Sequence, residues 1–324
     1  MPPPALDRGE AASEKPQAAG LREWTVPEGL AGERADRVVS SLLEVSRSVS
    51  RRLIEAGEAV GPHGRPLKPA ERVEAGTALW IGDPPERKIQ PEPVDFEVVY
   101  DDEHLAVVVK PEGVITHPGT AVPSQTGTLA AGLLHRYPQI EGVGLPSRWG
   151  IVHRLDRATS GLMVTALSEM AYWELGAALR RREVKRRYLA LVHGGMEAAR
   201  GAVEAPLGPD PRRRGTRAVV AGGKYALTRY RVVGSRSDPP LSLLEVELET
   251  GRTHQIRVHM ASIGRPVVGD RLYSGRPDPL GAGRMWLHAS ELEFPHPADP
   301  SVQMQHRSPF PPELGRRIVG LSGG

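Results

Sequence analysis

The sequence contains no cysteine among its 324 residues. This absence excludes disulfide bonds, zinc sites with thiolate ligands and a cysteine nucleophile, and it fits a cytoplasmic protein. No run of about 18 apolar residues is present, and the first residues lack the apolar core of a secretion signal. We therefore expect a cytoplasmic protein with no membrane partner.

Lysine is also scarce: six of the 42 basic residues are lysines, so 36 are arginines. The net charge is only +3, so total charge alone says little about nucleic acid. Arginine presents a planar fork to phosphates and base edges, which suits an RNA-binding protein. GC-rich coding explains the same excess equally well, so composition leaves both explanations open.

Motifs for nucleotide cofactors are missing. Neither a GxGxxG string nor a Walker-type phosphate loop occurs. His254 and His259 are five residues apart, which fits neither a helical metal site nor an HExxH motif. The sequence therefore predicts no cofactor and no bound metal.

The chain divides into four parts by composition. Residues 1–20 are rich in proline, alanine and charge and predict a disordered tail. Residues 21–85 predict a small α+β unit, and residues 86–95 a proline-rich linker. In residues 96–321, β-type runs dominate over a few helical stretches, without strict βαβ alternation. This pattern predicts an α+β domain on a mostly antiparallel mixed sheet with flanking helices.

The small unit shows two amphipathic helical patterns. One carries Val38 and Leu42, and the other has Ser46 as its N-cap and ends at Gly57. Arginines cluster on this unit, among them Arg34, Arg47 and Arg51. Charge alone fits either a solvated helical surface or an RNA contact.

The segment from Gly150 to Val164 consists of two apolar strands around a polar turn. Asp156 lies in this turn between Arg154 and Arg157, so we expect its carboxylate to be ionised. An ionised aspartate between rigid strands suits a nucleophile or base. An Asx-turn or a salt bridge would use the same residue, and this segment alone does not separate the two interpretations.

The segment from Arg180 to Gly194 starts with the densest positive run of the chain: Arg180, Arg181, Arg182, Lys185, Arg186 and Arg187. Such a run suits a phosphate backbone, although a solvated surface is the alternative. We expect a strand to begin at Tyr188, whose ring could stack on a base or simply be a strand aromatic.

A third segment runs from Leu248 to Asp270. Its strand is expected to end at Gly251, and Thr253 is the expected cap of a helix that carries His254 and Arg257.

Taken together and in this order, these segments resemble the pseudouridine synthases of the RluA group, which act on bacterial ribosomal RNA. The resemblance rests on HRLDRATSG (His153–Gly161), VVYDDEHLAVVVKPEGVITHPG (Val98–Gly119), VKRRYLALVHG, LETGRTHQIRVHMASIGRPVVGDRLY and LHASELEFPHP. The small unit resembles the RNA-binding domain named after small-subunit ribosomal protein S-four, on GERADR and SRSVSRRLIEAGEAV. Ala158 departs from an acidic residue common in the family, and GPHG replaces a usual VNG-type turn.

The resemblance implies a cofactor-free isomerase that detaches uracil from ribose, rotates it and rejoins it through carbon 5. Asp156 matches the aspartate that attacks either the anomeric carbon or the uracil ring. Tyr188 matches a tyrosine that stacks on the base and is a candidate general base. Arg257 matches the arginine that keeps the aspartate ionised, and Arg154 the one that fills the gap left by the flipped uridine.

The resemblance also implies RNA as the partner, with large-subunit ribosomal RNA favoured over transfer RNA, and we expect a monomer. The residues expected to bind RNA are Arg154, Arg157, Arg180, Arg181, Lys185, Arg186, Arg252 and His254, together with Arg34, Arg47 and Arg51. Two other hypotheses remain. One is a non-catalytic RNA-binding factor for ribosome assembly. The other is a carboxylate-dependent hydrolase, which would need a second acid near Asp156.

Overall fold

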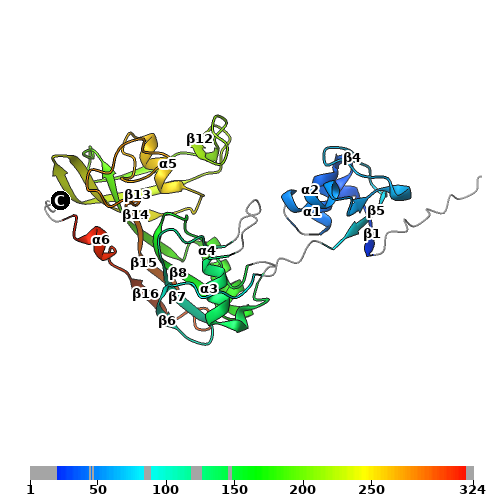
Figure 1. The fold of residues 1–324 in the computed structure, drawn as a ribbon, viewed down its shortest axis with the longest axis horizontal. Coiled ribbons are helices and arrows are strands. Elements are labelled where there is room, and N and C mark those ends of the chain that lie inside the picture. Colours follow the sequence, from blue (N-terminus) through cyan, green and yellow to red (C-terminus); the bar gives the residue numbers. More distant parts are fainter. Residues whose placement is uncertain are drawn as a thin grey trace, which may run out of the picture. The chain divides into compact units, whose positions relative to one another are not determined.

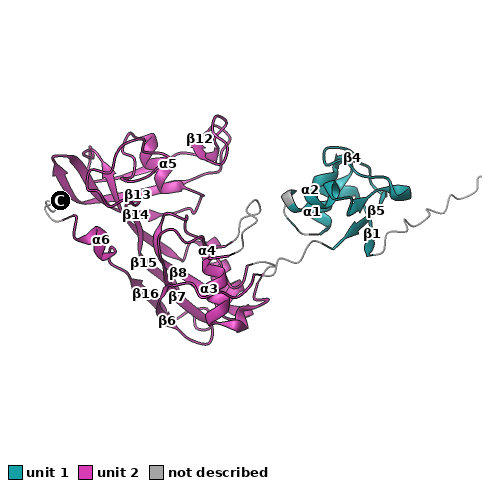
Figure 2. Cartoon of the chain, viewed as in Figure 1, with its two compact units in different colours: residues 1–88 teal, residues 89–324 magenta. Residues whose placement is uncertain are grey.

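The computed structural model describes residues 20–43, 45, 47–83, 89–117, 126–144 and 148–318. The chain forms two compact units, residues 1–88 and 89–324 (Figures 1 and 2). The expected tail before Gly20 and the expected cap Ser46 lie outside the described residues. In the part of the chain that is described, no helix is long and apolar enough to cross a membrane.

Unit 1 is a small α+β unit with its own apolar core. A three-stranded antiparallel sheet has the order β1 (Leu21–Thr25), β5 (Ala78–Gly82), β3 (Ala59–Val60), and β2 (Glu33–Arg34) pairs with β4 (Arg72–Val73). Helices α1 (Ala35–Leu42) and α2 (Arg47–Glu55) carry the apolar stripes that the sequence predicts. Their buried members, such as Val38 and Leu53, pack with Leu79 and Ile81 of the sheet.

Unit 2 is built on a nine-stranded sheet. Its strands are β6 (Glu97–Asp101), β7 (Leu105–Lys110), β8 (Ser160–Ala166), β9 (Lys185–His193), β10 (Arg200–Glu204), β13 (Leu227–Ser237), β14 (Pro240–Leu248), β15 (Leu287–Pro295) and β16 (Gln303–Arg307). The order is β10-β13-β14-β9-β15-β8-β7-β6, and β16 pairs with β15. A separate pair joins β11 (Leu207–Pro209) and β12 (Arg217–Val219). The helices are α3 (Leu129–Arg136), α4 (Glu169–Arg181), α5 (Gln255–Ser262) and α6 (Pro312–Gly315).

The predicted α+β class with a mostly antiparallel mixed sheet is confirmed. Within the nine-stranded sheet, β8 and β15 pair in parallel, and the other pairings are antiparallel. At this parallel pair Gly161 lies opposite Ala289 with a φ of 120°. A Cβ at Gly161 would overlap the backbone of Ala289, so this glycine permits the close approach of the two central strands.

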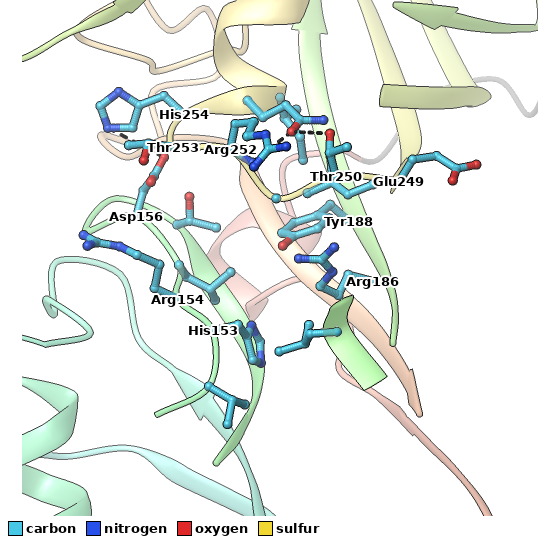
Figure 3. A pocket seen from close by; sticks show the side chains of 18 of the residues that line it. His153, Arg154, Asp156, Arg186, Tyr188, Glu249, Thr250, Arg252, Thr253 and His254 are labelled. Carbon is cyan, nitrogen blue, oxygen red and sulfur yellow. Dashed lines mark hydrogen bonds and ion pairs between the residues drawn. The ribbon is translucent and has the colours of Figure 1, made fainter. Parts of the chain in front are cut away.

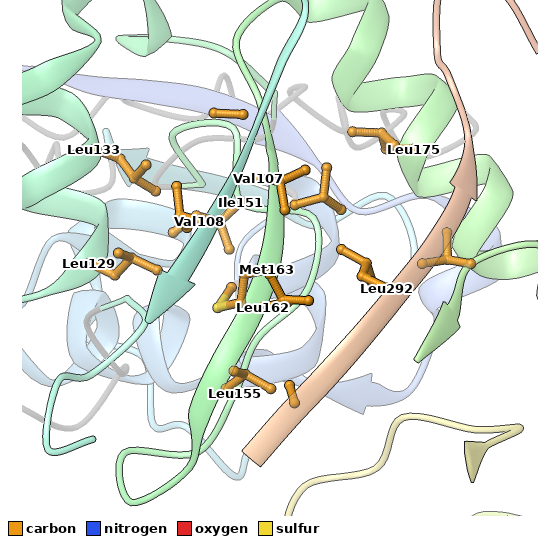
Figure 4. Packing of buried hydrophobic residues seen from close by; sticks show 14 of the residues in the cluster. Val107, Val108, Leu129, Leu133, Ile151, Leu155, Leu162, Met163, Leu175 and Leu292 are labelled. Carbon is orange, nitrogen blue, oxygen red and sulfur yellow. The ribbon is translucent and has the colours of Figure 1, made fainter. Parts of the chain in front are cut away.

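The main core of unit 2 lies between its central strands and helices α3 and α4. Figure 4 shows side chains of this cluster, including Val107, Val108, Leu129, Leu133, Leu162, Met163, Leu175 and Leu292. Strands β7 and β8 are buried on both faces, which explains their nearly continuous apolar sequences. The polar turn before β8 is therefore attached to a rigid, fully packed strand.

Four boundaries differ from the sequence-based expectation. Strand β14 ends at Leu248, not at Gly251. Residues 89–95 of the expected linker belong to unit 2, because Ile89 is buried in its core and the Glu92 backbone N–H donates to Ala131. Strand β9 begins at Lys185, not at Tyr188. The cap of α5 is His254, in the left-handed region with φ 60°, and not Thr253. In the same turn the Gln255 side chain accepts the Arg252 backbone N–H.

Candidate active site

A cleft of about 540 Å³ opens over the centre of the sheet in unit 2. Its walls come from the turn before β8, from β9 and from the segment between β14 and α5 (Figure 3). Seven arginines line it against two carboxylates, Asp156 and Glu249. The three segments that the sequence singles out, although up to a hundred residues apart, therefore meet in one positively charged cleft.

Asp156 is held by a rigid turn. The Thr159 backbone N–H donates to the Asp156 carbonyl at 3.0 Å. The preceding residue, Leu155, is bound on both sides by the buried hydroxyl of Thr116, which donates to the Leu155 carbonyl at 2.9 Å and accepts from its N–H at 3.3 Å. The carboxylate itself remains 17% exposed toward the cleft. This combination of a fixed backbone and an accessible side chain suits a group that reacts.

Arg257 links Asp156 to a second, fully buried aspartate. Its Nη1 donates to Asp156 Oδ2 at 3.1 Å, while Nε and Nη2 bind both oxygens of Asp270 at 2.7 and 2.9 Å. Burial opposes the charge on Arg257, but the hydrogen bonds and charge of Asp270, together with Asp156, raise its pKa above the usual value. The guanidinium is thus fixed in position and charged when it meets Asp156.

Asp270 was not assigned a role from the sequence. Its Oδ1 also accepts the backbone N–H groups of Leu272 and Tyr273, at 2.9 and 3.2 Å. The preceding Gly269 has φ 73°, and a Cβ there would overlap the Arg284 carbonyl. The Gly-Asp pair that closes the segment from Leu248 to Asp270 is the sequence signal for this turn, but the partner of the aspartate becomes clear only in the fold.

His254 also faces Asp156, with its Nε2 3.9 Å from Oδ2. Its Nδ1 lies 2.7 Å from the Tyr273 hydroxyl, which already accepts the Arg217 backbone N–H. The Nδ1–hydroxyl contact is a single hydrogen bond whose donor is set by the tautomer of the His254 ring. Burial lowers the pKa of His254 despite the nearby carboxylate, so the neutral form is favoured.

Tyr188 lies on β9, between Val246 of β14 and Ala289 of β15, across the cleft from Asp156 (Figure 3). Burial raises the pKa of its hydroxyl, with a smaller contribution from the charge of Asp156 and an opposing one from Arg186. The phenol form therefore predominates near neutral pH. The ring forms a flat, mostly apolar wall suited to a base.

Two further groups support the Asp156 turn from below. His153 accepts the Val164 backbone N–H through Nε2 at 3.1 Å, and burial together with Arg186 lowers its pKa to about 3. Lys110 is fully buried, and its ammonium donates to the carbonyls of Pro111, Val114 and Arg157 at 2.7, 2.8 and 3.4 Å. Burial lowers the pKa of Lys110 to about 7. Both groups position backbone, and Lys110 had no role in the sequence-based prediction.

Known proteins that are similar to this chain show its family. A family model described as RNA pseudouridylate synthase matches residues 104–262. An uncharacterized RNA pseudouridine synthase of Mycobacterium bovis is 39% identical over 311 residues, which cover 93% of this chain and 98% of the relative. The chain belongs to the RNA pseudouridylate synthase family. Its reaction is therefore the isomerisation of uridine to pseudouridine in RNA, as the sequence motifs predict.

Other members of the family are similar over most of their length. The ribosomal large subunit pseudouridine synthase D of Escherichia coli is 38% identical over 306 residues, which cover 90% of this chain and 91% of that protein. Among solved structures, human RNA pseudouridylate synthase domain containing 1 is 28% identical, with a TM-score of 0.54 over 71% of this chain and 89% of that one. The pseudouridine synthase fold predicted from the sequence is thereby confirmed.

The residues expected to bind RNA fall into two groups in this pseudouridylate synthase. Arg154, Arg180, Arg186, Arg252 and His254 line the cleft with Asp156, Tyr188 and Arg257. The others are bound to protein groups outside it. Arg157 donates to the Gly113 carbonyl at 2.9 Å, Arg181 pairs with Glu183 at 2.8 Å, and Lys185 pairs with Glu293 at 2.6 Å.

The basic run from Arg180 to Arg187 is thus less positive than its sequence suggests. In addition to Arg181 and Lys185, Arg187 pairs with both Glu247 and Glu291, at 3.2 and 2.7 Å. In unit 1, Arg34 and Arg47 both bind the buried Asp36, and Arg51 pairs with Glu55.

Proposed function

We propose that this enzyme modifies uridines of large-subunit ribosomal RNA and that Asp156 is its nucleophile. The observation that carries the assignment of Asp156 is its one-sided hydrogen bonding. Oδ2 is fixed by Arg257, while Oδ1 accepts no hydrogen bond in the described part of the chain. The large-subunit substrate is supported by the relatives named ribosomal large subunit pseudouridine synthase D, in Xylella fastidiosa and Escherichia coli, each 38% identical.

The chemistry requires one bond to break and one to form. Asp156 attacks the ribose anomeric carbon or the uracil ring, and the bond between the anomeric carbon and N1 breaks. The uracil rotates and its carbon 5 bonds to the anomeric carbon. The bond between Asp156 and the substrate then breaks and frees the carboxylate, the carbon 5 proton is lost and N1 gains a proton. An ionised aspartate held by a guanidinium suits this role, because its charge and its rotamer are both fixed before the substrate arrives.

Tyr188 is proposed to stack on the flipped uracil and to act on the proton that must move. Its ring faces the cleft opposite Asp156. Because burial keeps its hydroxyl protonated, the tyrosine must receive help to act as a base, and the charge of Arg186 supplies some of it. Removal of the hydroxyl alone separates stacking from proton transfer.

The cleft arginines are proposed to open the RNA and hold its backbone. A base inside a stem is reached only after extrusion, which costs a few kcal/mol. We assign Arg154 to the gap that the extruded uridine leaves and Arg180, Arg186 and Arg252 to phosphates. Arg186 lines the cleft, and its buried Nε has no hydrogen-bond partner among the described residues.

Unit 1 is proposed to be the S-four-like RNA-binding domain of a monomeric enzyme. Arg34 and Arg47 share Asp36, yet their side chains are 44% and 58% exposed, so each keeps nitrogens for phosphate.

A hydrolase is disfavoured by the remaining carboxylates near the cleft. Asp270 is saturated by Arg257, and Glu249 binds Arg229 at 3.0 Å and points away from Asp156 (Figure 3).

The test is release of tritium from RNA labelled at carbon 5 of uridine. We expect the wild type to release it from large-subunit ribosomal RNA and not from transfer RNA. Asp156→Asn should lower kcat by about 10⁴-fold or more while it still binds RNA, because the neutral amide cannot attack. Tyr188→Phe should lower kcat by about 10²-fold with little change in KM, since the ring remains.

Release only from transfer RNA would refute the substrate. Release by Asp156→Asn at the wild-type rate would refute the nucleophile. RNA binding without release by the wild type, on partly assembled subunits as well as free RNA, would favour the non-catalytic assembly factor.

A further inference from the structure

A second recess, of about 340 Å³, opens beside the cleft. It shares Arg148, Val152, Leu179 and Arg180 with the cleft, so the two are adjacent. The remaining lining residues are Ile151, Tyr172, Trp173 and Gly176. Its size is at the lower end of the range for small-molecule sites, about 300–1,000 Å³. None of the groups discussed for the isomerisation reaction uses this space apart from Arg180.

Trp173 is an exposed aromatic that is nevertheless fixed in orientation. It is 45% exposed on α4. Its indole N–H donates to Glu169 Oε1 at 2.7 Å, and Glu169 Oε2 in turn accepts the Gly144 backbone N–H at 2.7 Å. Tyr172 packs edge-on against the indole, with the ring centres 5.2 Å apart and an interplanar angle of 86°. One face of a large aromatic ring is therefore presented to solvent without the freedom of an ordinary surface side chain.

Gly176 creates the hollow next to this ring. Trp173, Gly176 and Arg180 are spaced three and four residues apart, which places them on one face of α4. A Cβ at Gly176 would meet only the end of Arg180 Nη1, at 3.6 Å, so close packing does not require glycine here. A glycine inside a helix is less stabilising than alanine because more backbone freedom is lost. The benefit that offsets this cost is the open floor between the indole and the arginine.

We propose that this recess, which we call the Trp173 recess, binds the base of a second, unpaired nucleotide of the RNA substrate, close in sequence to the target uridine. The base stacks on Trp173, and its phosphate meets Arg148 and Arg180 at the rim. The proposal rests on the proposed action on RNA, and it adds a contact that reads the neighbourhood of the target.

The charge and position of the recess select this ligand. No carboxylate lines it, and two arginines do, which complements a phosphodiester and opposes a basic partner. Stacking on an aromatic accepts any base, and its strength suits single-stranded RNA. Because the recess adjoins the cleft through four shared lining residues, a strand whose uridine occupies the cleft passes next to it.

The test uses fragments of large-subunit RNA in which each nucleotide flanking the target uridine is made abasic in turn. Affinity is measured in an Asp156→Asn background, so that it does not depend on chemistry. One abasic position should weaken binding by about tenfold. Trp173→Ala should weaken binding of intact RNA by a similar factor, and the same abasic position should then have no further effect. Trp173→Phe, which keeps an aromatic face, should restore most of the affinity.

Two matched variants guard against a purely structural effect. Met170→Ala removes another exposed apolar side chain of α4, 40% exposed and outside the recess, and should leave affinity unchanged. Gly176→Leu fills the recess with Trp173 intact and should weaken binding as Trp173→Ala does. The proposal would be overturned if the affinity losses from Trp173→Ala and from every abasic position were independent, so that their fold-changes multiplied. It would also be overturned if both Trp173→Ala and Gly176→Leu bound RNA with wild-type affinity.

The failure of the proposed substrate looks different. If the wild type releases no tritium from any large-subunit fragment, the substrate assignment fails. The proposal for the Trp173 recess is then tested with the same abasic series in an RNA fragment that the enzyme does modify.

Discussion

Asp36 in unit 1 and Asp156 in unit 2 are both bound by arginine, and the binding differs. In unit 1 both oxygens of Asp36 accept from Arg34 and Arg47, through four contacts of 3.0–3.1 Å. In unit 2 Asp156 accepts one hydrogen bond from Arg257, at 3.1 Å, through a single oxygen. The side chain of Asp36 is 5% exposed and that of Asp156 is 17% exposed.

The difference separates a carboxylate that holds structure together from one that is available for chemistry. The hydrogen bond from Arg34 lowers the pKa of Asp36. The ionised Asp36 of α1 also binds Arg47, the first residue of α2, and so joins the two helices. Arg257 makes three hydrogen bonds to carboxylates, and two of them go to Asp270 rather than to Asp156. Arg257 can thus be rigid and charged while Oδ1 of Asp156 accepts no hydrogen bond from the described residues.

The largest effect on this difference between the two aspartates is expected for Arg257→Lys. Lysine keeps the charge but cannot bind Asp270 in bidentate fashion and reach Asp156 as well. We expect kcat to fall by about 10²-fold, because Asp156 loses its fixed position. Stability should fall by about 1.5–3 kcal/mol, since one charged hydrogen bond in a buried site is lost. Tritium release and urea unfolding measure the two effects.

The matched control for this variant is Arg187→Lys. Arg187 also binds two carboxylates, Glu247 and Glu291, but it is outside the cleft and partly exposed. Its kcat should stay within about twofold of the wild type, because exposed pairs contribute little. Equal losses in kcat for both variants would show that the Asp270–Arg257–Asp156 arrangement has no special role.

The second prediction concerns the other aspartate. Asp36→Asn should destabilise unit 1 by about 1.5–3 kcal/mol, because a buried amide cannot replace four charged contacts. The kcat for tritium release should not change. Hydrogen exchange of peptides from α1 and α2 reports the stability of this unit. Exchange as slow as in the wild type, or a loss of kcat as large as in Asp156→Asn, would contradict the separation between the two aspartates.

The motifs were sufficient to predict which residues meet in the cleft, but not which cations are free. Asp156, Tyr188, Arg257 and Arg154 come together in the cleft as the resemblance implies. Counting charges fails along β9, however, because Lys185 faces Glu293 across the pairing with β15. Such cross-strand partners are set by register, and a basic run reads the same whether or not carboxylates lie opposite.

Buried polar support is equally hard to predict. Asp270, Thr116 and Lys110 act by binding backbone or another side chain, and their spacing from Asp156 follows no local rule. The two-unit division was predictable from composition. The assignment of residues 89–95 was not, because the burial of Ile89 depends on a core that forms only in three dimensions.

The last prediction concerns Lys110, which binds the Arg157 carbonyl next to Asp156. Its pKa of about 7 lies below the usual value because of burial. Between pH 7 and about 10 the unfolded chain therefore binds a proton at this residue that the folded chain does not, so stability gains with rising pH. The gain is on the order of 1 kcal/mol per pH unit. Lys110→Met should lack it, and urea unfolding of both proteins at pH 7 and pH 9 measures the difference. Parallel pH profiles for the two proteins would show that Lys110 does not titrate in this range.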